Sequence, residues 1–180
     1  MKVAWFSCGV TSAVACKLAV DEYGKDNVEL FYIVINSAHE DNERFILDCE
    51  NWIGKKINKI QSTKFKDQFE VIEKIKYVNG VNGAPCTLHL KKNVRFAIEK
   101  SNNFDGQIFG FEFEKKEINR AIRFSQQYSD VKPLYPLIDR KITKSQCAEI
   151  LLINGIKLPK MYELGFHNNN CIGCVKGGKG

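Results

Sequence analysis

The chain has no apolar run long enough to cross a membrane. None of its segments approaches the ~20 consecutive apolar residues that a transmembrane helix needs, although 44% of its 180 residues are hydrophobic. The first residues lead directly into a strand-like segment, without the pattern of a secretory signal. Seven cysteines, an odd number, do not suit a complete disulfide framework. These observations predict a cytoplasmic protein with reduced thiols and no membrane partner.

Internal repeats, linker segments and aromatic-rich basic runs are also missing. A chain without linkers and of this length suits one compact domain. Basic runs interleaved with aromatics are typical of single-strand nucleic-acid binders, and the sequence contains none. The net charge of +6 suits an anionic partner such as a nucleotide or an RNA, or equally a solvated lysine-rich surface.

Strand-like and helix-like segments alternate along the chain. The expected strands are 3–6, 30–35, 56–61, 107–111 and the extended segment 132–138. The expected helices are 13–20, 41–53, 67–77 (with Phe69, Ile72 and Ile75 inward), 87–100, 115–126 and a helix capped by Thr143 that runs to Ile153. This alternation predicts a single α/β domain with a doubly wound, mainly parallel five-stranded sheet of order 3-2-1-4-5 and helices on both faces. Residues 1–156 are expected to form the domain, with 157–180 as a docked tail that contains the Cys-x-x-Cys.

The segment 7–12 follows the first strand and is rich in hydroxyl groups. Ser7, Thr11 and Ser12 supply donors, and Gly9 lets the backbone approach a ligand closely. A strand that turns sharply into a helix points free backbone N–H groups at one spot, which suits phosphate or sulfate. The alternative is an ordinary strand–turn–helix junction with a capping hydroxyl. The loop is not a Walker A motif, because it has no lysine.

This loop resembles the PP-loop of the N-type ATP pyrophosphatases and of the adenylyl-sulfate and phosphoadenylyl-sulfate (PAPS) reductases. Those families carry Ser-x-Gly-x-x-Ser after their first strand, and Ser7, Gly9 and Ser12 match the fixed positions. ATP-cleaving members usually have Gly and Asp where this chain has Cys8 and Thr11. The absent carboxylate removes an expected magnesium contact and puts ATP cleavage in doubt.

The resemblance extends to other strand ends, which parallel topology brings to one edge of the sheet. Gly110-Phe111-Glu112 with the later Arg120 is similar to the strand-end Gly and downstream Arg that handle sulfonucleotide anions, although Arg120 also suits a plain surface position. The resemblance implies an adenine nucleotide, ATP or PAPS, with or without Mg²⁺. The implied contacts are Ser7, Gly9, Val10, Thr11 and Ser12 for the anion, main chain at Val34 and Asn36 for adenine, and Gly110, Phe111 and Arg120.

Three cysteines suit a metal or cluster site. Cys171 and Cys174 form a Cys-x-x-Cys, and Cys86 lies 85 residues upstream of Cys171. Three thiolates on a [4Fe–4S] cluster leave one iron open. Zinc would need a fourth ligand, for which His89 or His167 is near in sequence. A redox-active dithiol is the third alternative.

Two PP-loop families resemble this cysteine set. Adenylyl-sulfate reductases hold a cluster with a Cys-Cys pair and a distant Cys-x-x-Cys, whereas Pro85 stands before Cys86 here. Cluster-dependent tRNA thiolation enzymes use three cysteines. The reductases also carry a Glu-Cys-Gly-x-His-like segment that supplies a nucleophilic Cys, and here Leu164 stands in that place.

The remaining cysteines differ in their surroundings. Cys16, Cys49 and Cys147 fall on apolar helix stripes and are expected in the core. Cys8 lies in the anion loop near a helix N-terminus, where the pKa of a thiol tends to fall, so we expect either a catalytic nucleophile or a tolerated small residue.

The favoured function is adenylation-dependent sulfur transfer by a PP-loop enzyme with an iron–sulfur cluster. Its partners would be tRNA or another sulfur acceptor, a protein that donates sulfur or electrons, and a second copy in a homodimer. One alternative is thiol-dependent reduction of adenylyl sulfate or PAPS. The other is a non-enzymatic nucleotide- or tRNA-binding module with a zinc clip.

Overall fold

A computed structural model describes residues 1–81 and 83–177, so Asn82 and the last three residues of the predicted tail lie outside it. The strands are β1 (Lys2–Phe6), β2 (Val28–Val34), β3 (Asn58–Gln61), β4 (Gln107–Ile108) and β5 (Pro133–Leu134). The α-helices are α1 (Val10–Tyr23), α2 (Asn42–Ile53), α3 (Gln68–Ile75), α4 (Asn93–Ser101), α5 (Lys115–Gln127), α6 (Pro136–Asp139), α7 (Lys144–Ile153) and α8 (Lys160–Glu163). Short 3₁₀ turns are η1 (Lys25–Asn27) and η3 (Ser129–Val131), and η2 (Thr87–Lys92) is a π-helix.

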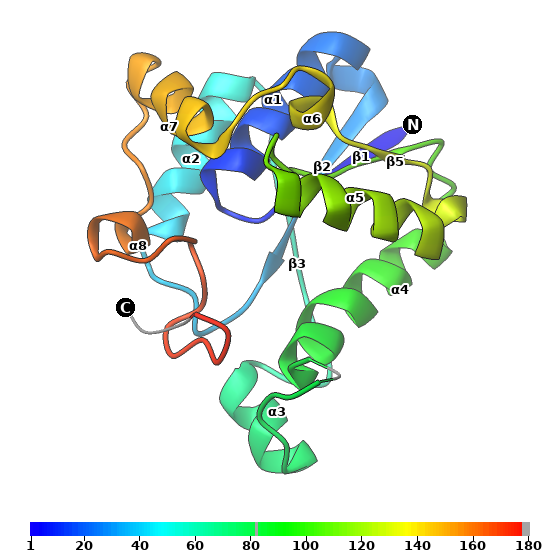
Figure 1. The fold of residues 1–180 in the computed structure, drawn as a ribbon, viewed down its shortest axis with the longest axis vertical. Helices are drawn as coiled ribbons and strands as arrows, with labels where there is room; N and C mark the ends of the chain where they lie inside the picture. The colour runs from blue at the N-terminus through cyan, green and yellow to red at the C-terminus, as the bar shows by residue number, and fades with distance from the viewer. Residues whose placement is uncertain (82, 178–180) are drawn as a thin grey trace.

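The five strands form one parallel sheet in the order β3-β2-β1-β4-β5, which confirms the predicted topology. Val3 at the centre pairs with Glu29 of β2 and with Gln107 of β4. Helices surround the sheet, and α1 packs against α2, α6 and α7 (Figure 1). Because all strands run parallel, the loops after β1, β2 and β4 lie at the same edge.

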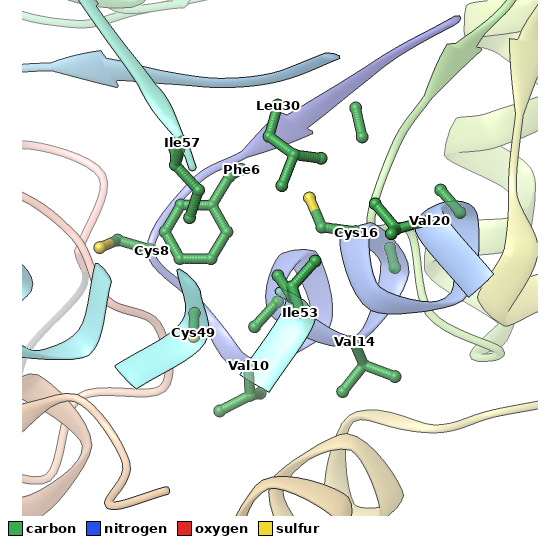
Figure 2. Close-up of a cluster of buried hydrophobic side chains, with 14 of the residues drawn as sticks. Phe6, Cys8, Val10, Val14, Cys16, Val20, Leu30, Cys49, Ile53 and Ile57 are labelled. Atoms are coloured by element: carbon green, nitrogen blue, oxygen red, sulfur yellow. The ribbon is translucent and has the colours of Figure 1, made fainter. Parts of the chain in front are cut away.

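The main core lies between the central strands and α1, α2 and α7. Its members include Phe6, Leu30, Phe45 and Cys16, and Figure 2 shows the part around α1. The helix α2 buries Phe45, Ile46, Cys49 and Ile53 on the side that faces this core. Cys16, Cys49 and Cys147 are all in this core, as expected from their spacing.

The structure corrects three local predictions. Phe69 and Ile75 of α3 are exposed rather than inward, because Gln68 and Val71 occupy the buried side of that short helix. Residues 132–138 are not extended throughout, since Pro136 begins α6, where a missing N–H costs nothing. The helix expected over 87–100 starts as the π-helix η2 before α4. The Thr143 cap of α7 is confirmed by its hydrogen bond from the Gln146 N–H.

In the described ranges, no helix combines the length and the apolar character that crossing a bilayer requires.

Candidate functional site

The loop between β1 and α1 is organised by one hydroxyl group. Ser12 Oγ accepts hydrogen bonds from the Ser7 N–H at 3.0 Å and the Gly9 N–H at 3.3 Å, and it donates to the Gly9 carbonyl at 2.9 Å. The Ser7 hydroxyl also donates to it at 3.1 Å. Ser12 is buried and Ser7 is exposed, so the third fixed position shapes the loop while the first faces outward.

The end of β4 packs directly on the start of α1. A Cβ added to Gly110 would lie 2.8 Å from both Cα and N of Ser12, so only glycine fits there without a shift. The next residue, Phe111, stacks on Tyr135 with a centroid distance of 5.5 Å. The Arg120 guanidinium lies 4.5 Å from the Phe111 ring centroid and pairs with Glu117. The structure therefore brings Gly110 to the loop and joins Phe111 with Arg120.

Adenine was predicted to bind main-chain groups at Val34 and Asn36, but some of these groups are already bonded within the protein. Val34 lies in the parallel ladder opposite Gln61. The Asn36 N–H donates to the Lys66 carbonyl at 3.2 Å. The Asn36 side chain is exposed and borders a cavity of about 270 Å³ beside Lys64 and Lys66. This edge can still offer side-chain groups to a ligand.

The C-terminal tail covers the β1–α1 loop. The Asn169 side chain donates to the Cys8 carbonyl at 2.6 Å and to Asn42 Oδ1 at 2.8 Å. The Tyr162 hydroxyl accepts from the Val10 N–H at 3.4 Å. Beside them, Val10, Lys144, Tyr162 and His167 line a cavity of about 360 Å³. Burial lowers the pKa of Lys144, and the nearby Glu112 opposes that change.

Cys8 is oriented into the protein and not toward a ligand. Its backbone adopts a φ of 61°, and its fully buried side chain lies by Phe6 (Figure 2). Its thiol donates to the Asn42 carbonyl at 3.7 Å. Burial, together with the neighbouring Cys49, raises the pKa of Cys8. The prediction of a lowered pKa is therefore wrong, because removal from water outweighs the helix N-terminus, and this environment opposes the nucleophilic role expected for Cys8.

Native thiol labelling should reflect this difference in environment. We expect iodoacetamide at pH 8 to modify Cys86 and Cys174, which are partly exposed, and to leave Cys8 unmodified. Peptide mass spectrometry of the folded protein measures this directly, with the urea-unfolded protein as the control in which all seven thiols react. Rapid labelling of Cys8 in the folded protein would contradict the buried, protonated thiol.

Two of the three predicted metal ligands lie close to the end of β2. Cys86 and Cys171 both pack against the small apolar cluster of Ile35, Val71 and Leu90. Burial raises the pKa of Cys171, and Lys91 opposes that rise. The tail is fixed here, since the Ile172 N–H donates to the Ser37 carbonyl at 2.8 Å and Gln68 Nε2 donates to the Ile172 carbonyl at 2.7 Å. Thiols distant in sequence thus share one region.

The fit to a metal is partial. None of the three thiols is part of a disulfide, and each is partly exposed. Within residues 1–81 and 83–177, however, no three His, Cys, Asp or Glu side chains are grouped closely enough to hold a metal ion. The donor chemistry suits a soft metal or an iron–sulfur cluster, and binding one requires the three sulfurs to move closer together. Of the proposed fourth ligands, His89 packs edge-on against Phe65 and His167 is exposed.

Comparison with known proteins identifies the fold. No protein-family model matches the chain, and neither does any curated protein. Among solved structures, phosphoadenylyl-sulfate reductase from Candida auris, in a phosphate complex, matches with a TM-score of 0.67 and 10% identity over 94% of this chain and 80% of that one. The U34-tRNA thiolase NcsA from Methanococcus maripaludis, with its [4Fe–4S] cluster, matches with a TM-score of 0.58 and 18% identity over 88% of this chain and 57% of that one. The chain therefore shares the α/β fold of these two proteins, with its parallel five-stranded sheet.

Sequence reasoning did not find Tyr162, Asn169, Lys144 or His39. Tyr162 and Asn169 bond to the β1–α1 loop, and Lys144 lines the cavity beside it, but no motif connects these positions with the loop. His39 lines a cavity of about 410 Å³ together with Cys171 and Cys174. Its Nδ1 accepts the Asp41 N–H at 3.1 Å, which fixes the ring orientation. Only its position after β2 could have pointed to it.

Proposed function

We propose that this protein is a PP-loop enzyme that binds an adenine nucleotide and transfers sulfur to an acceptor activated by adenylation. The observation that carries the proposal is the PP-loop itself, held by Ser12 at the carboxyl edge of a parallel sheet. N–H groups at a helix start favour an anion, and the absence of a side chain lets the backbone approach the anion closely at Gly9. The proposed unit is a domain of residues 1–156 with the tail docked on it.

The proposed chemistry starts with an oxygen of the acceptor. That oxygen attacks the α-phosphorus of ATP, pyrophosphate leaves, and an adenylated acceptor remains. A hydrosulfide ion from the donor then attacks the carbon that bears this oxygen, so that a C–S bond forms while the C–O bond breaks and AMP leaves with the oxygen. The PP-loop holds the anionic leaving group, and Lys144 contributes positive charge at the adjoining cavity. The chain lacks the usual PP-loop carboxylate for magnesium, and Lys144 is a positive charge in the cavity that Val10 also lines.

Cys86, Cys171 and Cys174 are the residues that would hold a [4Fe–4S] cluster. Such a cluster, bound by three thiolates, offers one open iron for sulfide or substrate. Support comes from the donor types and from the shared packing of Cys86 and Cys171 on one apolar cluster. The thiolase NcsA carries a [4Fe–4S] cluster, and its fold is similar. The hydrogen bonds of Ile172 with Ser37 and Gln68 hold the Cys-x-x-Cys in the region of Cys86.

Reduction of adenylyl sulfate or PAPS is a second candidate. The fold likeness to the PAPS reductase favours it, because it covers 94% of this chain. Leu164 stands against it, since an exposed leucine cannot attack a sulfonucleotide where the reductases use a cysteine. Sulfur transfer is therefore our first choice, in a cytoplasmic setting with reduced thiols.

The two candidates give different products. Protein purified without oxygen should release pyrophosphate from ATP in the presence of a bulk tRNA pool, and it should leave PAPS intact when thioredoxin is supplied. Pyrophosphate release is followed by a coupled colorimetric assay, and PAPS by chromatography. PAPS consumption without pyrophosphate release would replace the first candidate with the second. Absence of both reactions would overturn the assignment to sulfur transfer.

A further inference from the structure

A tyrosine of the tail occupies the start of α1. The N–H of Val10, the first residue of the helix, donates to the Tyr162 hydroxyl at 3.4 Å. A Cβ added to Gly9 would lie 3.4 Å from the same oxygen. The hydroxyl therefore lies against the two loop residues that a phosphate or sulfate would approach.

The Tyr162 hydroxyl is neutral where it lies. Burial raises the pKa of Tyr162, and this outweighs the opposing effect of the main chain of Val10 and Asn169. An oxygen that accepts a backbone N–H at a helix start occupies the place that a phosphate oxygen takes there.

The tail also bonds to Lys144, a cation of the same cavity. Lys144 Nζ donates to the His167 carbonyl and, at 2.8 Å, to Asn168 Oδ1. It lies 5.4 Å from the Tyr162 ring centroid and lines the same cavity of about 360 Å³ as Val10. The helix start and the lysine, which together suit an anion, are both bonded to the tail.

The segment is fixed at both ends. Before Tyr162, the Lys160 N–H donates to Asp41 Oδ2 at 2.8 Å, and Arg44 donates to the Leu158 carbonyl at 3.1 Å. After it, the Asn169 side chain donates to the Cys8 carbonyl. In Figure 1 this part of the chain is orange to red and begins at α8. These contacts hold the Tyr162 hydroxyl in place at the helix start.

We propose that residues 160–169 form an autoinhibitory strap, in which the Tyr162 hydroxyl holds the position of an oxygen of the nucleotide's anionic tail. The inference rests on the proposed function, because the nucleotide is the ligand that displaces the hydroxyl. On binding, the anion takes the Val10 N–H and the Lys144 ammonium, and the strap leaves the loop. A change that weakens the strap must then raise the affinity for the anion, since the two compete.

Calorimetric titration with inorganic pyrophosphate and with ATP tests this competition. Tyr162→Phe keeps the ring and removes only the hydroxyl, so we expect about threefold to tenfold tighter binding, the value of one hydrogen bond. Tyr23→Phe removes a hydroxyl at the other end of α1 and should leave the affinity unchanged. In the wild-type protein, amide hydrogen exchange of residues 160–169 should become faster when pyrophosphate is added.

The outcomes separate this inference from the proposed function. Wild-type binding with equal or weaker binding by Tyr162→Phe would overturn the strap and leave nucleotide binding intact. Slower exchange of residues 160–169 with pyrophosphate would also overturn the strap, because the tail would then be closing on the ligand. Absence of binding in every variant, the wild type included, would overturn the proposed function and the strap together.

Discussion

Gly110→Ala should destabilise the protein more than any other single-methyl addition in this site. The new Cβ would lie 2.8 Å from Cα and N of Ser12 and 3.0 Å from the carbonyl carbon of Thr11. These are backbone atoms of the loop and of α1, which cannot rotate away as a side chain can. Overpacking of this kind costs about 1–3 kcal/mol. We expect urea unfolding to show that loss, with weaker ATP binding because the loop must shift.

Gly9→Ala is the matched control within the same loop. Its Cβ would meet the Tyr162 hydroxyl at 3.4 Å, an ordinary contact, and its backbone φ of −108° is open to alanine. The unfolding free energy should therefore change by less than about 0.5 kcal/mol, as at sites without strain. Equal stability of Gly110→Ala and the wild type would contradict the close packing of β4 on the PP-loop.

Removing Cys86 should abolish cluster binding. Wild-type protein purified without oxygen should contain about four irons and four sulfides per chain, and Cys86→Ala should contain close to none, because two remaining thiolates cannot hold a [4Fe–4S] cluster. Iron is measured by emission spectrometry and sulfide by methylene blue formation, and the cluster absorbance near 400 nm should disappear in parallel.

Cys16→Ala is the control for that loss, because the Cys16 thiol is buried in the main core and is not one of the proposed cluster ligands. It should keep the iron of the wild type. Colourless wild-type protein with one zinc per chain would contradict the cluster and favour a zinc clip. Equal iron in Cys86→Ala and the wild type would remove Cys86 from the ligand set.

The sheet could be predicted from the sequence because its strands are short apolar runs separated by helical spacing. The apolar run from Leu30 to Ile35 indicates a strand of a parallel sheet, and its place beside β1 follows from the crossover rules. Sequence spacing gave the wrong buried side of α3, because contacts with distant residues determine which side chains are buried there. Phe69 has helical spacing with Ile72, yet Gln68 takes the buried side because Ser37 and the Ile172 carbonyl bind its amide.

The sequence was enough to predict the loop of the site, but not the tail residues that cover this loop. Ser7, Gly9 and Ser12 are close in sequence, so their spacing was enough to indicate the turn. Tyr162 reaches Val10 across 152 residues, and nothing in either segment specifies that contact. Cys8 failed for another reason, because residue type and helix position indicated a reactive thiol while a positive φ accompanies a side chain packed in the core.

The most direct test of the proposed anion site is calorimetric titration of ATP into the wild-type protein and Ser12→Ala, with Ser101→Ala as an exposed control at the end of α4. Loss of the Ser12 hydroxyl leaves the N–H groups of Ser7 and Gly9 without their acceptor, so the loop no longer holds its shape. The predicted result is ATP binding by the wild type and by Ser101→Ala, with Ser12→Ala weaker by about 1–3 kcal/mol. No binding of ATP by the wild type, or equal affinity in all three proteins, would contradict an anion site at this loop.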